Sequence, residues 1–235
     1  MRAMPTTDAP LDADACRAAS ETVDADHPAV RIFAERAAGD ATDDRDRAVR
    51  LYYAVRDGIR YDPYGIALDA ESLRASTTLK HGRGWCVAKA VLLAAGCRAL
   101  GIPARLGFAD VRNHLSTERM RRSMQTDVFY WHGYTSIRLD DRWLKATPAF
   151  NVELCRKFNL APLEFDGTSD SLFHAFTPDG TRHMEYLRYR DEYLDVPIDA
   201  IRSTFATEYA GTASAGDTGG ADFDRDVEAE IRKTE

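Results

Sequence analysis

The sequence contains only four cysteines, and they lie far apart along its 235 residues, at Cys16, Cys86, Cys97 and Cys155. No two of them form a C-x-x-C pair, and such wide spacing is not typical of a zinc knuckle or of a disulfide framework. Free thiols are the rule in reducing compartments. The cysteine content therefore predicts a cytoplasmic protein whose thiols are not paired.

Long apolar segments are also lacking. No run of 18 apolar residues occurs, which argues against a membrane span, and residues 1–16 hold no apolar segment of the kind that a secretory signal contains. The net charge of −7 disfavours nucleic acid and anionic membranes as partners. Lysine is scarce, with five against 26 arginines, and this bias indicates a GC-rich genome rather than any mechanism.

The sequence lacks several motifs that indicate a bound cofactor. Neither G-x-x-x-x-G-K-[ST] nor G-x-G-x-x-G occurs, so nothing supports nucleotide binding. The carboxylate pairs at 43–44 and 140–141 fit a helix cap and a turn, which explains them without glycosidase chemistry. A metal site built from His81, Cys86 and His132 would match no common ligand spacing. We therefore expect no metal and no organic cofactor.

The stretch from His81 to Arg105 is the most informative part of the chain. Gly82 and Gly84 precede Cys86, and a helical pattern of apolar residues then begins. Gly101 and Pro103 predict where this helix ends. The pattern indicates a mostly buried helix of roughly four turns with Cys86 in its first turn. The apolar positions are Val87, Ala90, Val91, Leu93, Ala94, Cys97 and Leu100.

A cysteine at a helix N-terminus has chemical consequences. The first backbone N–H groups of a helix lack internal partners, and the helix dipole is positive there. Both effects favour a thiolate, and the same N–H groups can hold the oxyanion of an acyl-transfer intermediate. The structural alternative is that Cys86 is a small apolar residue of the core, as the spacing predicts for Cys97.

At 44% apolar residues the chain is long enough for one globular domain with a proper core. We expect a mobile segment over residues 1–25, a domain over 26–210, and a largely disordered tail over 211–235 with a short helix in the last ten residues. The predicted elements are helices over 28–38 and 43–59, a helix or ordered loop over 69–79, a strand over 104–111, a short helix or lid near 118, and a hairpin of strands 128–139 and 142–147. Residues 148–200 show little periodicity, which predicts an irregular wrap with some short helix.

These residues resemble the transglutaminase-like superfamily, whose members share the core of papain-type cysteine proteases and use a Cys–His–Asp triad. The resemblance lies in G-x-C at a helix start, in A-L-G-I-P-A-R at 99–105 and in V-R-D-G-I-R-Y at 55–61, and it covers roughly residues 45–150. It implies an α+β fold in which N-terminal helices and the nucleophile helix pack on an antiparallel sheet. It also suits a prokaryotic source, because the chain is similar to small bacterial or archaeal members.

His132 is the expected partner of Cys86 among six histidines. It lies in the strand-like sequence F-Y-W-H-G-Y-T-S-I, 46 residues after the cysteine. In members of the superfamily the catalytic histidine opens a strand of this kind and follows the cysteine by a few tens of residues. Taken alone, a histidine among aromatics is more often a packed core residue.

The third member of the triad departs from the pattern of the superfamily. Thr147 stands where aspartate is expected before a proline. With a two-residue turn at 140–141, residue 139 pairs with residue 142, and the two numbers in every cross-strand pair add up to 281. His132 then lies opposite position 149, and Thr147 is its diagonal neighbour on the facing strand. Asn151 is an alternative, because asparagine orients the histidine in papain-like sites. Carboxylates further along, at Glu153, Glu164 and Asp166, could also reach the site.

The sequence therefore predicts a thiol-dependent acyl-transfer enzyme that acts on a peptide, protein or small amide substrate. Hydrolysis, as in a cysteine protease or amidase, is favoured over transfer to an amine. Trp85 either lines a substrate cleft or packs beneath it. The alternative is a non-catalytic binding or scaffold domain of the same fold that has lost the triad aspartate.

Overall fold

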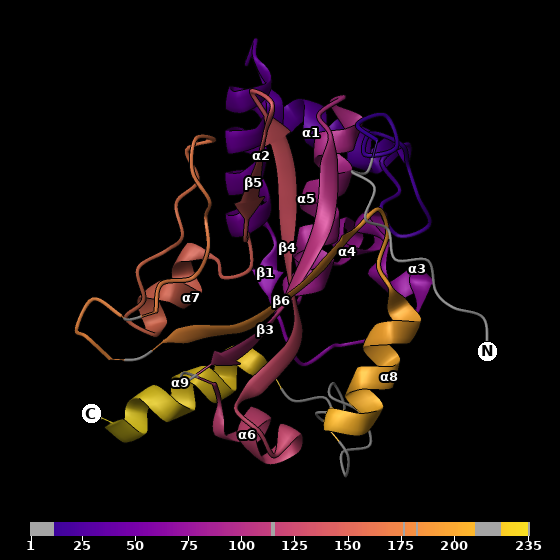
Figure 1. Ribbon diagram of the computed structural model, residues 1–235. Coiled ribbons are helices and arrows are strands. Elements are labelled where there is room, and N and C mark those ends of the chain that lie inside the picture. The colour runs from indigo at the N-terminus through magenta and orange to yellow at the C-terminus, as the bar shows by residue number, and fades with distance from the viewer. Residues whose placement is uncertain (1–11, 114–115, 176, 182, 210–221, 235) are drawn as a thin grey trace, which may run out of the picture.

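A computed structural model describes residues 12–113, 116–175, 177–181, 183–209 and 222–234 (Figure 1). Residues 211–221 of the predicted tail lie outside these residues, as do residues 1–11 of the segment expected to be mobile. The domain boundaries proposed from the sequence stay a prediction.

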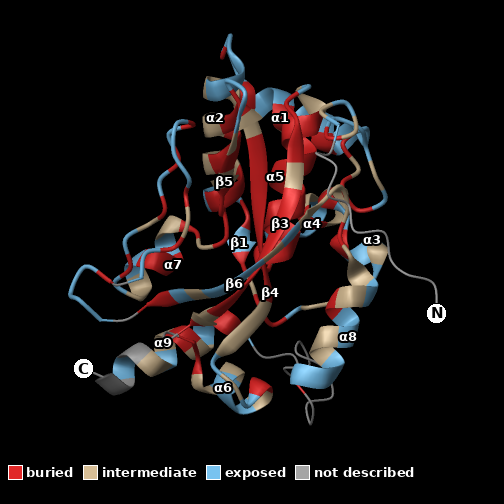
Figure 2. Cartoon of the chain, viewed as in Figure 1, coloured by how far each residue is buried: buried red, intermediate tan, exposed pale blue. Residues whose placement is uncertain are grey.

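Helix α5 (Cys86–Ala99) is the central element of the fold. Every residue from Cys86 to Arg98 is buried, because the sheet covers one side of the helix and N-terminal helices cover the other (Figure 2). Its length of 14 residues confirms the predicted four turns. After the helix, Gly101 adopts a positive φ of 79°.

The antiparallel sheet has the strand order β5-β4-β3-β6. Its strands are β3 (Ala104–Asn113), β4 (Val128–Leu139), β5 (Arg142–Ala146) and β6 (Met184–Tyr193). Asp140 and Asp141 both have positive φ, as a two-residue hairpin turn that matches the twist of the strands requires. The turn pairs Leu139 with Arg142 and Thr135 with Ala146, which confirms the predicted register.

The N-terminal helices are α1 (Pro28–Ala38), α2 (Asp44–Gly58), α3 (Ala70–Leu73) and α4 (Ala75–His81). Helix α2 begins one residue later than predicted, because Asp43 is its N-cap residue and accepts a hydrogen bond of 2.9 Å from the Asp46 N–H. Between these helices, β1 (Arg60–Tyr61) pairs in parallel with β2 (Arg83–Gly84). This short pairing fixes the chain just before Cys86.

Lys89 joins helix α5 to the end of helix α2. Its side chain is fully buried, and Nζ donates hydrogen bonds to the carbonyl oxygens of Arg56 (2.9 Å) and Ile59 (2.5 Å). Burial lowers the pKa of the Lys89 ammonium to about 7, and the charge of Asp57 opposes this change. Lys89 lies one helical turn after Cys86, and its hydrogen bonds thus fix the V-R-D-G-I-R-Y segment (55–61) to the start of helix α5.

The second half of the chain is more regular than its sequence predicts. The expectation of an irregular wrap over 148–200 was wrong for β6, a ten-residue strand that pairs with β3. Two register shifts interrupt this pairing, and most β6 side chains are exposed or half-buried, so the alternation of apolar and polar residues is weak. The remaining helices are α6 (Glu118–Met124), α7 (Val152–Lys157), α8 (Ile198–Glu208) and α9 (Phe223–Thr234).

Residues 12–25, which fall in the segment expected to be mobile, pack against the rest of the protein. Cys16 and Val23 are fully buried. The backbone N–H groups of Glu21 and Thr22 donate to the carboxylate of Asp195, which follows β6.

Candidate active site

Cys86 is the first residue of helix α5 and is 7% exposed. Gly82 ends helix α4 in the left-handed conformation, with φ 62°, and this turn leads the chain through β2 into Trp85. Trp85 is the N-cap residue of α5, and its side chain forms no capping hydrogen bond. The first N–H groups of the helix are therefore not used by the capping residue.

Gly133 lets strand β4 approach the start of helix α5 closely. A Cβ atom at this position would lie 2.9 Å from the Val87 Cα atom and 3.3 Å from the Val87 nitrogen. The backbone N–H groups of Gly133, Val87 and Cys86 partly oppose the effect of burial on the pKa of the Cys86 thiol. The Cys86 sulfur thus lies at a helix terminus next to strand β4. The strand can approach the helix this closely only because residue 133 is glycine.

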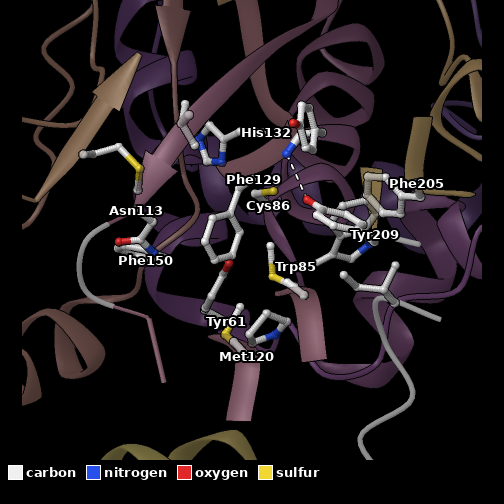
Figure 3. A pocket seen from close by; sticks show the side chains of 16 residues that line it. Tyr61, Trp85, Cys86, Asn113, Met120, Phe129, His132, Phe150, Phe205 and Tyr209 are labelled. Carbon is white, nitrogen blue, oxygen red and sulfur yellow. Dashed lines mark hydrogen bonds between the residues drawn. The ribbon is translucent and has the colours of Figure 1, made fainter. Parts of the chain in front are cut away.

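His132 precedes Gly133 on β4 and is 6% exposed. Its ring packs against Phe173, with centroids 5.3 Å apart, and against Tyr186, at 6.4 Å. The Nε2 atom is buried and has no hydrogen-bond partner among the described residues. Strand and helix thus bring Cys86 and His132 to one place, and Figure 3 shows both side chains at the same cavity.

A bulge in β4 sets the orientation of His132. Trp131 has a φ of 60°, which is rare for a bulky residue, and the β3–β4 register shifts beside it. The Trp131 N–H donates to the Asp110 carboxylate at 3.2 Å, and Arg190 pairs with the same carboxylate at 2.7 Å while lying 4.2 Å from the centre of the Trp131 ring. A buried ion pair therefore holds the strained residue next to His132.

The residues proposed to orient His132 differ in their surroundings. Asn151 is the N-cap residue of α7, and its Oδ1 atom accepts a hydrogen bond of 3.2 Å from the Tyr61 N–H. Thr147 is 1% exposed, and its hydroxyl has no hydrogen bond of standard geometry. Burial raises the pKa of the Tyr186 phenol, and Thr147 beside it partly opposes that rise. Thr147 and His132 therefore share Tyr186 as a neighbour.

The carboxylates predicted as further candidates are engaged elsewhere or lie on the surface. Glu164 pairs with Arg56 at 3.2 Å and accepts a hydrogen bond from Tyr53. Asp166 is exposed and accepts hydrogen bonds from the Thr168 and Ser169 N–H groups. Glu153 lies in the first turn of α7. In the part of the chain that the structure describes, no carboxylate forms an ion pair with His132.

Burial makes both site residues neutral at rest. It raises the pKa of the Cys86 thiol to about 11, against which the three backbone N–H groups act only in part. It lowers the pKa of His132 to about 4. The helix terminus alone favours a thiolate, but the loss of solvent around the sulfur has the larger effect.

The sequence profile described as "Transglutaminase-like superfamily" matches residues 31–148, half of the chain. The chain belongs to this superfamily. The matched range contains Cys86 and His132, and it ends at Pro148, just after Thr147. The mixed fold, with a nucleophile helix on an antiparallel sheet, is the fold predicted for it.

The solved structures that resemble this chain belong to longer proteins. A "Putative Cysteine Protease" from Cytophaga hutchinsonii is 18% identical, with a TM-score of 0.46, over 62% of this chain and 45% of its own. A "putative protease" from Parabacteroides distasonis is 14% identical, with a TM-score of 0.37, over 54% of this chain and 26% of its own. The chain therefore covers less than half of either protein. No curated protein matches it.

Apart from Cys86 and His132, the cavity of this transglutaminase-like protein is lined by aromatic and apolar side chains with a single amide (Figure 3). The centre of a water-sized sphere can occupy about 40 Å³ of it, and all the space between its atoms, open mouth included, is about 570 Å³. Trp85 lines it and is 6% exposed, with its ring 6.4 Å from that of Phe205 on α8. The two roles considered for Trp85 are therefore compatible, because the side chain both packs and faces the cavity.

A metal ion has no evident place in the described part of the chain, where no three His, Cys, Asp or Glu side chains are grouped to hold one. Nor is any described helix long and apolar enough to cross a membrane.

Three functional neighbours of the site escaped the sequence prediction. Gly133 could have been found, because a glycine directly after the histidine breaks a strand of otherwise large residues. Asp110 and Tyr186 could not, since their roles depend on how β3 pairs with β4 and β6.

Proposed function

We propose that this protein is a thiol-dependent acyl-transfer enzyme that hydrolyses an amide or peptide bond. The observation that carries the proposal is the meeting of Cys86 and His132 at one cavity, where Gly133 lets strand β4 lie close to the start of helix α5. A buried histidine from an aromatic strand and a cysteine from a helix terminus are the nucleophile and base that this chemistry needs.

In the proposed mechanism the resting pair is neutral. As substrate binds, the Cys86 thiol passes its proton to His132, and the sulfur attacks the carbonyl carbon. Because Nε2 of His132 is enclosed, Nδ1 is the nitrogen that would accept the proton. Backbone N–H groups at the start of α5, including that of Cys86, hold the oxyanion.

The second half of the reaction reverses the proton transfer. His132 protonates the leaving amine as the C–N bond breaks, which leaves a thioester on Cys86. Water then gives a proton to His132 and attacks the thioester, so that a carboxylic acid leaves and the thiol is restored. An amine in place of water would give transamidation by the same steps. Neither course needs a metal or an organic cofactor.

The third member of the triad is part of the proposal. Two buried polar atoms, Nε2 of His132 and Oγ1 of Thr147, have no hydrogen bond of standard geometry to any described residue. We infer that the Thr147 hydroxyl accepts the imidazole N–H when substrate is bound, which would fix the tautomer. Asn151 is less suitable, because its side-chain oxygen already accepts from the Tyr61 backbone.

The test compares alkylation and turnover in matched variants. Iodoacetamide should label Cys86 faster than Cys97, which is fully buried and serves as the internal control. His132→Ala should slow labelling of Cys86 at least tenfold and leave Cys97 unchanged. Hydrolysis of a panel of N-acyl 4-nitroanilides should be lost in Cys86→Ala. Full activity in that variant would exclude the mechanism.

The alternative is a non-catalytic binding domain, and one observation favours it: no described carboxylate stabilises a charged His132. In that case Cys86 would be as inert as Cys97, no amide would be hydrolysed, and Cys86→Ala would bind peptides as the unmodified protein does.

A further inference from the structure

Among the residues that the structure describes, none that lines the cavity at Cys86 carries a full charge. None of its sixteen lining residues is Asp, Glu, Lys or Arg. Charged residues make up 29% of the sequence, so sixteen positions filled at that rate would carry about four or five of them. The lining is therefore poorer in charge than the chain as a whole.

The polar atoms of the cavity wall are few, and some are already engaged. The Tyr209 hydroxyl accepts a hydrogen bond of 3.0 Å from the Tyr130 N–H and donates one of 3.3 Å to the Val128 carbonyl. Figure 3 shows the first of these bonds, between strand β4 and the C-cap residue of α8. The wall thus offers few groups that could replace the water around a charged ligand.

Apolar side chains from separate elements surround the sulfur. Met120 and Met124 come from α6, Phe129 from β4, and Met184 and Phe205 from β6 and α8. Methionine and aromatic side chains give a polarisable surface that suits aromatic and long aliphatic groups. The last two residues lie beyond the part of the chain that matches the superfamily.

We propose that this cavity selects substrates with a bulky, uncharged, apolar group next to the scissile amide, such as an aromatic or long aliphatic side chain. The inference rests on the proposed function of Cys86 as the nucleophile. It adds the class of substrate, because a charged group would lose its hydration in the cavity without gaining an oppositely charged partner among the described residues.

The first arm of the test measures reaction at Cys86. Four N-substituted chloroacetamides, carrying benzyl, methyl, carboxymethyl or 2-aminoethyl groups, are compared, and each rate is divided by the rate with glutathione. The benzyl compound should react at least tenfold faster than the other three, as expected when an apolar group fills an apolar site. The modified cysteine is identified by mass spectrometry.

The second arm measures binding without reaction. The corresponding acetamides, which lack the chlorine, are tested by saturation-transfer difference NMR on the same protein. Only N-benzylacetamide should give a clear signal. Selective binding with no alkylation of Cys86 would support the cavity inference and contradict the proposed function. Fast alkylation at equal rates by all four compounds would support the nucleophile and overturn the inference.

A charge placed in the wall should invert the preference. Met120→Lys should raise the relative rate of the carboxymethyl compound at least tenfold and lower that of the benzyl compound. Ile32→Lys, at a 49% exposed position on α1, adds the same charge far from the cavity and should leave all four rates unchanged. If Met120→Lys does not fold, Phe205→Lys makes the same test from α8. An unchanged order of rates in a folded cavity variant would also overturn the inference.

Discussion

Burial changes the pKa values of Cys86 and His132 in opposite directions, because it disfavours the charged form of each side chain. It moves the pKa of the thiol up to about 11 and that of the imidazole down to about 4. Between these values both groups are neutral, so the reactive ion pair must form by proton transfer within the site. A papain-like site with a charged resting pair would lack this wide neutral range.

The proposed mechanism predicts an acid limit of activity that is set by the pKa of His132. The imidazole accepts the thiol proton only when it is neutral, which holds above about pH 4 and fails as the pH falls through that value. Labelling of Cys86 by iodoacetamide, followed from pH 3 to 8, should therefore lose half its rate near pH 4 rather than near the ordinary histidine value of about 6.5. A midpoint near 6.5 would mean that His132 is solvated.

Thr147→Asp restores the residue type that the superfamily pattern expects. A carboxylate next to the imidazole should raise the pKa of His132 by about one to three pH units, because it stabilises the charged form. NMR titration of the His132 ring measures this directly. Thr147→Asn is the matched control, since it has a similar size and no charge. An equal pKa in both variants would show that position 147 does not face His132.

At the scale of elements, the site depends on the contact between helix α5 and strand β4. The hairpin turn, the bulge at Trp131 and the glycine after His132 all act on β4, while β1, β2 and Lys89 fix the chain around the start of α5. Cys86 and His132, the proposed nucleophile and base, are therefore positioned by two independent sets of contacts.

Gly133→Ala should separate these two elements. The new methyl group would lie 2.9 Å from the Val87 backbone, which cannot move as a flexible side chain could. Overpacking of this kind should lower the free energy of unfolding by about 1–3 kcal/mol and slow labelling of Cys86. Urea denaturation and alkylation measure the two effects. Gly58→Ala, where no atom lies within 4 Å of the new methyl group, should change neither.

At the scale of the whole molecule, the residues beyond the superfamily match complete the site. Strand β6 supplies Tyr186 and the Arg190 that pairs with Asp110, and α8 supplies part of the cavity wall. Helix α9 packs Phe223 against Tyr61 and Tyr64, and its Asp226 pairs with Arg119 on α6. The residues after 148 therefore enclose a site whose two proposed reactive residues, Cys86 and His132, lie before them.

The buried histidine also links stability to pH. Its pKa is lower in the folded protein than in the unfolded chain, so the stabilising neutral form is fully present above about pH 6.5 and is lost as the pH falls towards 4. This change is on the order of 3 kcal/mol. Denaturant unfolding of the protein and of His132→Gln, from pH 4 to 7, should show a steeper fall for the histidine protein. Parallel curves would contradict a neutral buried imidazole.

The sequence by itself determined the local features of this protein. The helix that begins at Cys86, the Asp140-Asp141 turn and the β4–β5 register follow from residue types and spacing alone, because turn and helix signals act over a few residues. The motif at 99–105 indicated the superfamily for the same reason. Cys86 and His132 were named as partners from order along the chain and from the resemblance.

Only the tertiary structure decided the state of the site. The place of β6 in the sheet, the ion pair behind Trp131 and the uncharged cavity arise from pairings between distant segments, which leave little periodic signal. The helix terminus predicted a thiolate, yet the packed fold makes the thiol neutral. The reason is that a pKa depends on solvent exposure in three dimensions, which no local pattern of residues encodes.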